Sequence, residues 1–320
     1  MRSPLTFVAA LALVGCAAPA HPLREAVPSG TLYLAGVRPS TLIVVHVRSS
    51  RARTYRLRGL GPGDPPYMLA TTGGRLVTFT LGRAFSYGPG FKEPPRSLGH
   101  AWFFVPSARP GRVWLALLDD PRTVTLRGLR EVTVKGRVTV AHTARPPGWP
   151  LAALDTGLVI QRRTLELWNP STGAIVRSLP GVFPLAAHGS LLASCSDACP
   201  ALHVTDTRSG TDLRMRPSRA FRFSASYDGA FSTDGHLLAV PAKLRHGGGY
   251  RVALVDLERR RARLLRGAPL DRGYPLFSWA RSGWLFFNTG HGRIAAYRPG
   301  ASRATLLPVR VPAFTDMAAP

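Results

Sequence analysis

The sequence predicts an all-β fold built from short antiparallel hairpins, and two observations support this. First, the 32 glycines and 29 prolines are spread along the 320 residues, between short apolar runs, instead of being clustered. Second, the stretch 149–181 contains four such runs, PLAAL, LVIQ, TLELW and AIVRSL, which are separated by turn residues at DTG, RR and NPSTG. Short runs between turn signals are typical of strands, not of helices.

A hairpin repeat recurs along the chain. Each copy is an alternating strand, a turn rich in Gly, Ser, Asn, Asp or Arg, and a second strand that ends near Pro or Gly. Copies that align without a gap begin at Thr41, Thr164, Ala201, Arg251 and Arg293.

A second hairpin precedes most of these copies. It joins a small apolar strand to a more hydrophobic strand through a turn that ends in Gly or Ser, and it occurs at 150–161, 184–195, 229–240 and 275–287. Two hairpins in succession give four antiparallel strands, which is one blade of a β-propeller.

The remaining segments complete a ring. Two less regular blades are expected at Pro66–Leu98 and His100–Thr143, while Thr31–Arg58 supplies only three strands. The stretch Val309–Met317 has the pattern of the missing innermost strand. The sequence therefore predicts a seven-bladed β-propeller of four-stranded antiparallel blades, closed by the C-terminal strand completing the N-terminal blade, with no open sheet edge. Seven blades give roughly 41 residues each, within the range of about 40–45 for WD40-type repeats.

The segments LELWNPSTGAIV, HVTDTRSG and VALVDLERRRARLL share one form, an apolar strand, an aromatic residue or Asp, a turn and a second strand. In this form the chain resembles bacterial WD40-like and YVTN-type β-propeller lipoproteins from about Thr31 to its end. No blade has the Gly-His and Trp-Asp pair of eukaryotic WD40 repeats, so the resemblance implies architecture and little else. The PSTG turn is also similar to a turn of quinoprotein propellers.

The N-terminus predicts export with a lipid anchor. Residues 1–15 form a signal peptide whose apolar run is too short to cross a bilayer. Its end, LVGC, resembles the bacterial lipobox, and this resemblance implies that Cys16 is lipidated; an ordinary secretory signal is the alternative. Residues 16–30 are small, polar and proline-rich, as in a flexible tether, and 31–320 form the propeller. The expected location is the bacterial cell envelope, on the extracytoplasmic side of the membrane, and the sequence does not say which membrane if the cell has two.

The formal net charge of +25 comes almost wholly from arginine, because only Lys92, Lys135 and Lys243 are lysines. One interpretation is attraction to an anionic partner such as lipid headgroups or an acidic wall polymer. The other is a compositional bias that spreads charge over strands and turns. No compact basic run of the nucleic-acid type is present, so we expect no nucleic-acid partner.

Two cysteines remain after Cys16. Cys195 and Cys199 flank a three-residue loop in the fifth blade, and outside the cytoplasm this spacing predicts a disulfide that staples the loop. A redox-active or metal-binding pair is the alternative, but no His or carboxylate ligands stand at metal spacing. We therefore expect no metal and no cofactor.

Catalysis in the central channel is the enzymatic alternative. Carboxylates on inner strands can bind a metal or act as acid and base, but those in Asp-Thr-Gly and Thr-Asp-Gly are expected to stabilise turns. His100 and His188 are expected at related inner-strand positions, which would suit lyase or lactonase chemistry. No GxSxG, HExxH, P-loop or dinucleotide motif is present. The acidic candidates are Asp155, Asp228, Asp234 and Asp316.

The better-supported site is a face of the ring. Loops between second and third strands, and connections between blades, emerge on the same face of a propeller, where binding residues collect. In blades five and six these are the cysteine loop, Arg216–Ser226 and Pro241–Tyr250. Interleaved Arg and aromatic residues there suit an anionic or carbohydrate-bearing ligand, or a protein partner, although solvated loops of an Arg-rich chain are the alternative. The candidate residues are Arg216, Arg219, Phe221, Arg222, Phe223, Lys243, Arg245, His246 and Tyr250.

The sequence thus favours a non-enzymatic, lipid-anchored propeller that binds an envelope protein or an anionic polymer, and its ligand is not specified. The alternatives are a propeller enzyme of lyase, lactonase or glycosidase type, and an envelope assembly factor that resembles quinoprotein-like propeller lipoproteins. Seven blades instead of eight argue against the last of these.

Overall fold

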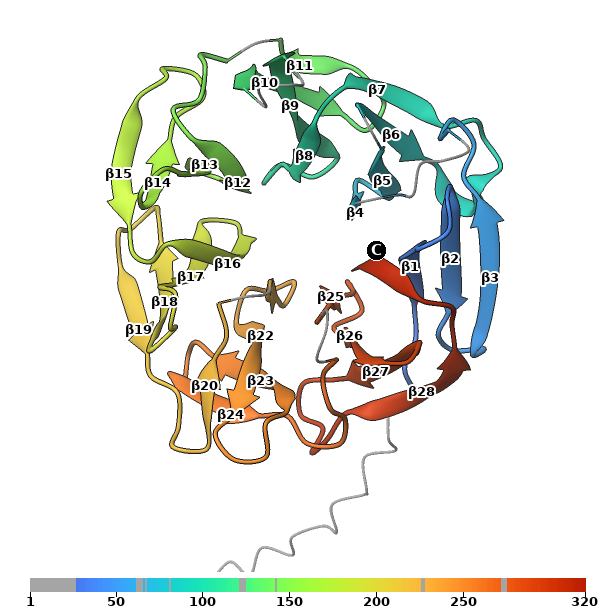
Figure 1. The fold of residues 1–320 in the computed structure, drawn as a ribbon, viewed down its shortest axis with the longest axis vertical. Coiled ribbons are helices and arrows are strands. Elements are labelled where there is room, and N and C mark those ends of the chain that lie inside the picture. Colours follow the sequence, from blue (N-terminus) through green and yellow to red (C-terminus); the bar gives the residue numbers. More distant parts are fainter. Residues whose placement is uncertain are drawn as a thin grey trace, which may run out of the picture.

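The chain forms a ring of antiparallel sheets around a central axis in a computed structural model (Figure 1). Residues 1–15 and Cys16, on which the predicted signal peptide and lipid anchor rest, lie outside the residues that the structure describes. The structure describes residues 27–61, 66, 68–80, 82–120, 125–141, 143–225, 228–271 and 275–320.

Seven sheets make up the ring, and each is one blade of a β-propeller. Six blades contain four strands, and blade 6 contains five because its innermost position is divided between two short strands. In blade 1 the strand order is β29-β1-β2-β3, so that the last strand of the chain completes the first blade. The predicted fold class and the predicted closure are both confirmed.

The strands of the first four blades have the following bounds, from the inner to the outer strand. Blade 1 consists of β29 (Phe314–Ala318), β1 (Thr31–Gly36), β2 (Thr41–His46) and β3 (Arg51–Arg56). Blade 2 consists of β4 (Met68–Thr72), β5 (Arg75–Thr80), β6 (Arg83–Tyr87) and β7 (Arg96–His100). Blade 3 consists of β8 (Phe103–Pro106), β9 (Arg112–Asp120), β10 (Thr125–Thr133) and β11 (Val138–Val140). Blade 4 consists of β12 (Trp149–Leu154), β13 (Gly157–Gln161), β14 (Leu165–Trp168) and β15 (Ile175–Leu179).

The other three blades follow the same course. Blade 5 consists of β16 (Phe183–His188), β17 (Leu191–Cys195), β18 (Leu202–Asp206) and β19 (Asp212–Met215). Blade 6 consists of β20 (Phe221–Phe223), β21 (Ala230–Phe231), β22 (Leu237–Leu244), β23 (Tyr250–Asp256) and β24 (Arg261–Leu264). Blade 7 consists of β25 (Phe277–Trp279), β26 (Leu285–Gly290), β27 (Arg293–Tyr297) and β28 (Thr305–Arg310).

The hairpin β14–β15 shows why the predicted repeat forms an outer pair of strands. The side chain of Asn169 accepts a hydrogen bond from the backbone N–H of Ser171 (2.9 Å), which fixes the turn locally. Gly173 then takes a φ of 74°, a conformation that favours glycine. Before the turn, Leu165 and Leu167 are buried on one face of the strand, and the neighbouring Trp168 is fully buried.

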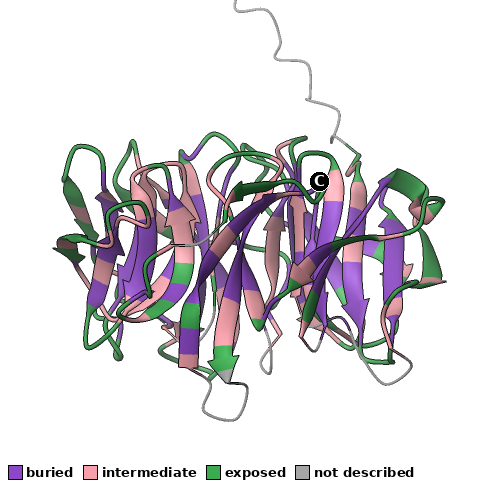
Figure 2. Ribbon diagram, turned by 90° about the horizontal axis from the view of Figure 1, so that it is seen from above, coloured by how far each residue is buried: buried purple, intermediate pink, exposed green. Residues whose placement is uncertain are grey.

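The core lies between blades, because the two middle strands of each blade present apolar side chains to both neighbours (Figure 2). One cluster joins blades 1 and 7 and includes Leu32, Ile43, Phe286 and Ile294, all fully buried. The outermost strands are largely exposed, as in β3, where only Tyr55 is half-buried. Each blade is therefore stabilised mainly by its neighbours, and the closing contact of blade 1 matters for the whole ring.

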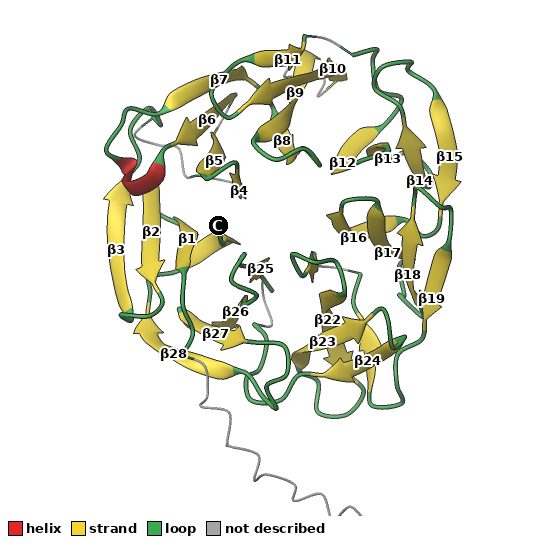
Figure 3. Cartoon of the chain, turned by 180° about the vertical axis from the view of Figure 1, so that it is seen from behind, coloured by secondary structure: helices red, strands yellow, loops and turns green. Residues whose placement is uncertain are grey.

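Helix is almost absent from the described part of the chain. Its one helical segment is the single turn η1 (Pro89–Phe91), which lies between β6 and β7 (Figure 3). No helix among the described residues is long and apolar enough to cross a membrane.

The structure corrects one feature of blade 6. The stretch Arg216–Ser226 was expected to be a connection without strand structure, but its residues Phe221–Phe223 form β20 and pair with β22. The register places Phe221 opposite Leu244 and Phe223 opposite Ala242. Because β22 is longer than the inner strands require, its end is free to pair with this additional segment. Ser226 lies outside the described residues.

Candidate binding surface and central channel

The loop between β17 and β18 is stapled as predicted. Cys195 and Cys199 form a disulfide with a Cα–Cα distance of 5.1 Å. Both residues are fully buried, and they belong to the same apolar cluster as Met215 and Phe221. The disulfide therefore holds the base of the loop against the start of blade 6 and is not exposed as a redox pair would need to be.

The structure brings the predicted segments of blades 5 and 6 together. The backbone N–H of Arg245, in the β22–β23 loop, donates to the carbonyl of Ala220, in the connection between the blades (3.1 Å). In β20, Arg222 lies directly opposite Lys243 of β22. Arg216, Arg219, Arg222, Arg245 and His246 are exposed, and Lys243 is half-buried.

The aromatic candidates do not share this surface. Phe221 and Phe223 are only 1% and 2% exposed, and their rings pack edge to face with centroids 5.6 Å apart. Side chains alternate along a strand, so both phenylalanines point into the core while Arg222 between them points outward. Tyr250 is half-buried and packs against the apolar cluster between blades 6 and 7. We use the name cationic surface for Arg216, Arg219, Arg222, Lys243, Arg245 and His246.

The cations of this surface are not neutralised by ion pairs among the described residues. Elsewhere the same chain does pair its arginines, as between Arg112 and Glu131 (3.1 Å). Like charges directly opposite each other in a sheet are destabilising, so the Arg222–Lys243 pair costs stability where it stands.

The predicted pair of channel histidines does not form. His188 ends the inner strand β16, but His100 ends β7, the outermost strand of blade 2. The reason is register: His100 pairs with Arg83 of β6, and the following blade begins only at Phe103. The prediction that both histidines occupy inner strands is wrong for His100.

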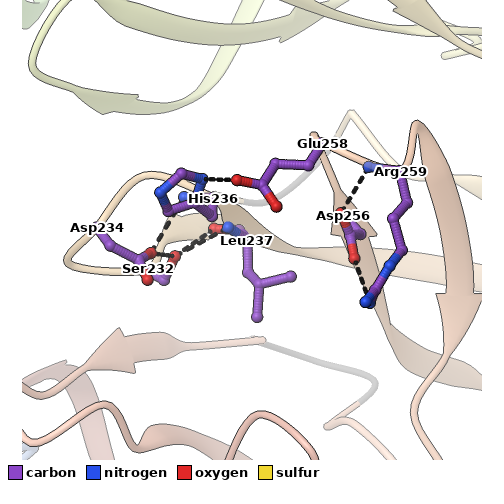
Figure 4. A network of polar contacts seen from close by, with 7 residues as sticks. All are labelled: Ser232, Asp234, His236, Leu237, Asp256, Glu258 and Arg259. Carbon is purple, nitrogen blue, oxygen red and sulfur yellow. Dashed lines mark hydrogen bonds and ion pairs between the residues drawn. The ribbon is translucent and has the colours of Figure 1, made fainter.

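Asp234 has the turn role that the sequence predicted. Its carboxylate accepts hydrogen bonds from the Ser232 hydroxyl and from the backbone N–H of His236 (3.1 Å), as Figure 4 shows. The bond from Ser232 is the main reason that the pKa of Asp234 is lowered. Beside this turn His236 pairs with Glu258 (3.0 Å), and the network stays on the turns of blade 6.

Asp155 lies in the turn after β12, and its carboxylate is 3.3 Å from the guanidinium of Arg208. Its backbone N–H donates to the carbonyl of Gly189 in the equivalent turn of blade 5 (2.9 Å). Asp155 therefore links blades 4 and 5 through the turns that follow their inner strands, β12 and β16.

Asp316 connects the closing strand to the next blade. Its carboxylate accepts hydrogen bonds from the backbone N–H of Leu69 in β4 (2.6 Å) and of Met317 (2.7 Å). Burial raises the pKa of Asp316 to about 6 although these donors oppose the rise, and the negative charge of Asp228 adds to it. Two carboxylates thus influence each other in the channel.

A pocket of about 850 Å³ lies in the channel along the inner strands of blades 3 to 6. Its wall is formed largely by small apolar residues and prolines of β12 and β16, including Ala152 and Ala186. Asp155, His188 and Asp228 are the titratable groups on this wall. The sequence analysis considered inner-strand carboxylates and His188 as candidates at the central channel, but it did not predict that these three residues share one pocket.

No metal cluster is present in the part of the chain that the structure describes, where no three His, Cys, Asp or Glu side chains come together as ligands. The candidate site therefore has two parts with opposite character. One is the cationic surface on the connection face of blades 5 and 6, and the other is the channel pocket.

The comparisons with known proteins show the fold. Neither a family model nor a curated protein matches this sequence. A functionally unknown protein from Desulfotomaculum acetoxidans is 10% identical with a TM-score of 0.59, over 91% of this chain and 99% of that chain. Apo AztD from Citrobacter koseri is 11% identical with a TM-score of 0.53, over 91% of this chain and 97% of that one.

TolB from Acinetobacter baumannii is also similar, at 13% identity and a TM-score of 0.51. The match covers 90% of this chain but 65% of TolB. At these identities the similarity concerns the β-propeller architecture of the chain, and its binding chemistry must be argued from its own residues.

Proposed function

We propose that the protein is a non-enzymatic, lipid-anchored β-propeller of the bacterial cell envelope that binds an anionic polymer through the cationic surface. The same proposal includes kinship with the WD40-like and YVTN-type propeller lipoproteins. The observation on which it chiefly rests is the Arg222–Lys243 pair, which lies across two hydrogen-bonded strands with no acidic partner among the described residues.

A bound polyanion would remove the cost of this arrangement. Guanidinium groups bind phosphate and carboxylate groups with two parallel hydrogen bonds, and a lysine adds a compact positive charge. Neighbouring cations then reinforce one another instead of repelling. A site that is unfavourable when empty and favourable when occupied is the behaviour expected of a binding surface.

The burial of Phe221 and Phe223 favours a polymer over a protein partner. Protein interfaces depend on a few aromatic or arginine anchors in desolvated pockets. The cationic surface offers exposed charge without exposed aromatic rings from β20, so its attraction is mainly electrostatic.

The direction of the chain supports the tether. Gly30 precedes β1, and its carbonyl accepts a hydrogen bond from the N–H of Val47 in the β2–β3 turn (3.0 Å). That turn lies on the face opposite to the connections between blades, because successive strands alternate in direction. A lipid anchor at the N-terminus would thus leave the cationic surface directed away from the membrane.

Two features support an extracytoplasmic location. The Cys195–Cys199 disulfide suits an oxidising compartment. The signal-like residues 1–15 and Cys16 in its lipobox-like context suit export and lipidation. Labelling the cells with a radioactive fatty acid tests the anchor, since Cys16→Ser should abolish incorporation into the protein.

Binding can be tested with immobilised polyphosphate as the probe. The triple variant Arg219→Ala, Arg222→Ala, Arg245→Ala should lose at least tenfold in affinity at about 0.15 M salt, because three adjacent charges are removed. The matched control is Arg51→Ala, Arg53→Ala, Arg56→Ala, which removes the same net charge from the exposed strand β3 of blade 1.

The control separates a local site from net charge. We expect the β3 variant to bind within about twofold of the unaltered protein, since charges beyond a Debye length of about 8 Å are largely screened. Equal losses in both variants would contradict the proposal and would assign the binding to overall charge.

The enzymatic alternative has less support. It relies on His and Asp residues of the channel, and one of its two candidate histidines, His100, lies instead on the outermost strand of its blade. His188 is the histidine that remains on the pocket wall beside Asp155 and Asp228.

A further inference from the structure

The channel pocket differs in charge from the rest of the molecule. The chain has 42 basic residues and a net charge of +25, yet no Lys or Arg is among the described residues that line the pocket. Outside the lining residues, Arg208 pairs with Asp155 in the turn after β12 (3.3 Å). A pocket that excludes the commonest charged residue of its own chain has a distinct electrostatic character.

Most polar side chains on the wall already have partners. The amide of Gln161 donates to the carbonyl of Val182 (3.1 Å), and the hydroxyl of Ser107 donates to Glu131 (2.7 Å). Asp228 is different, since its carboxylate accepts no hydrogen bond and forms no ion pair within the described ranges. Among the described residues of the pocket wall, it is the carboxylate without a partner.

The position of Asp228 is fixed by its neighbour. The backbone N–H of Gly229 donates to the carbonyl of Leu185, in the middle of β16 (2.7 Å). Asp228 is thereby held against the wall, exposed to channel water but surrounded by protein, and this desolvation raises its pKa. The negative charge of Asp228 in turn contributes to the raised pKa of Asp316.

We propose that the channel pocket binds a small organic cation, with an ammonium group on Asp228 and an apolar body against the Pro-Leu-Ala wall of β12 and β16. The volume of about 850 Å³ lies within the range of about 300–1,000 Å³ that is usual for small-molecule sites. An ammonium group relieves the repulsion between Asp228 and Asp316, and the apolar wall supplies the hydrophobic contact. His188, at the end of β16, can accept a hydrogen bond from the same ligand.

The positive exterior does not prevent this binding. At physiological salt, surface charges more than about 8 Å away are largely screened, whereas a carboxylate inside the channel is screened less. The inference is independent of the proposed polyanion site, which uses other residues on another part of the ring.

Isothermal titration of the full-length protein at pH 7.5 tests the pocket with three probes of nearly equal size. These are 2-phenylethylammonium, the neutral 2-phenylethanol and the anionic 3-phenylpropionate. We expect the ammonium probe to bind at least tenfold more tightly than the alcohol, and the anion to bind more weakly than either. Equal affinities for the three probes would overturn the proposal. So would an ammonium probe that binds no more tightly than the alcohol.

Two variants locate the binding. Asp228→Asn should lower the affinity for the ammonium probe about tenfold and leave that for the alcohol unchanged, which a collapse of the pocket would not do. Asp197→Asn is the matched control, since Asp197 is exposed in the disulfide loop and away from the channel. Retention of the ammonium preference in Asp228→Asn, or its loss in Asp197→Asn, would contradict the proposal.

A third variant tests the apolar wall. Ala186→Trp fills the pocket from β16 and should reduce the binding of the ammonium probe and of the alcohol alike. Circular dichroism of this variant shows whether the sheets are retained. If the folded variant binds the ammonium probe as before, the pocket is not the site and the inference fails.

Discussion

The cationic surface and the channel pocket differ in the sign of their charged residues. On the surface, Arg222 faces Lys243 with no described carboxylate to neutralise them. In the channel, the negative charge of Asp228 helps to raise the pKa of Asp316, and no Lys or Arg is among the described residues that line the pocket. Each region holds like charges near one another, although in the pocket Asp155 is paired with Arg208.

Random placement of a basic composition would not produce this division. Arginine that merely reflects a compositional bias would be expected in the channel as well as on the rim. Both regions also bear a cost, since like charges repel and buried carboxylates lose hydration. We propose that the two regions serve two binding chemistries on one ring of blades.

The largest expected effect concerns the salt dependence of polyanion binding. The logarithm of the affinity for polyphosphate should fall linearly with the logarithm of salt concentration, and the triple Ala variant of the cationic surface should reduce that slope by about 2–3, or nearly 1 per cation removed. Affinity measurements between about 50 and 200 mM salt give the slope. An unchanged slope would mean that these arginines do not touch the polymer. The cationic surface would then not be the polyanion-binding region.

The second prediction concerns the pH dependence of stability. Burial raises the folded-state pKa of Asp316 to about 6, well above the ordinary carboxyl value of the unfolded chain, about 3.9. The folded state therefore binds the proton more tightly than the unfolded chain does. Protonated Asp316 stabilises the fold fully below about pH 4, and this stabilisation is lost as the pH rises through about 6.

Urea unfolding measures this contribution by comparison with Asp316→Asn. The free energy of unfolding of the unaltered protein, minus that of the variant, should fall by on the order of 2–3 kcal/mol between pH 4 and pH 7. Glu131 and Asp234, whose pKa values are lowered, affect both proteins equally and cancel in the difference. A difference that does not change with pH would show that the pKa of Asp316 is not raised in the folded protein.

Much of the architecture could be predicted because hairpins are local. The repeat at 164–181 contains both strands and the turn of β14–β15, so the turn residues Asn169 and Gly173 stand in the sequence next to the strands that they join. The closing strand was predictable for a related reason, because one blade lacked a strand and the C-terminus had one left over.

Features that depend on register or on distant contacts could not be predicted. Phe221–Phe223 is too short to show a strand pattern, so the burial of its rings was missed. His100 resembled an inner-strand residue until its pairing with Arg83 placed it on the rim. The contact of Asp316 with Leu69 joins residues that are 247 positions apart in the chain. Such a contact leaves no local signal.

The third prediction concerns the disulfide loop. The double variant Cys195→Ala, Cys199→Ala should lower the free energy of unfolding by about 2 kcal/mol, the loop-entropy value for a short closed loop. Because the loop supports the cationic surface without supplying a cation, polyphosphate affinity of the folded variant should change by less than about twofold. A tenfold loss would make the loop part of the binding surface itself.

The smallest expected effect is the change in the free energy of unfolding caused by Arg222→Glu, and the sign of this change is informative. Arg222→Glu places opposite charges across β20 and β22, and it should raise the free energy of unfolding by about 0.5 kcal/mol while weakening polyphosphate binding. Arg53→Glu in β3, where the strand partner of Arg53 is the apolar Val44, is the control and should not show this gain. Loss of stability in Arg222→Glu would mean that the Arg222–Lys243 pair is not a source of repulsion.

A crossed titration tests the separation of the two sites most directly. Polyphosphate and 2-phenylethylammonium are each titrated into the unaltered protein, the triple Ala variant of the cationic surface, and Asp228→Asn. We predict that the triple variant loses polyphosphate affinity at least tenfold and keeps its affinity for the ammonium probe, while Asp228→Asn shows the reverse. If both variants lose both ligands, or if neither loses its own, the two regions are not separate binding sites and the account is contradicted.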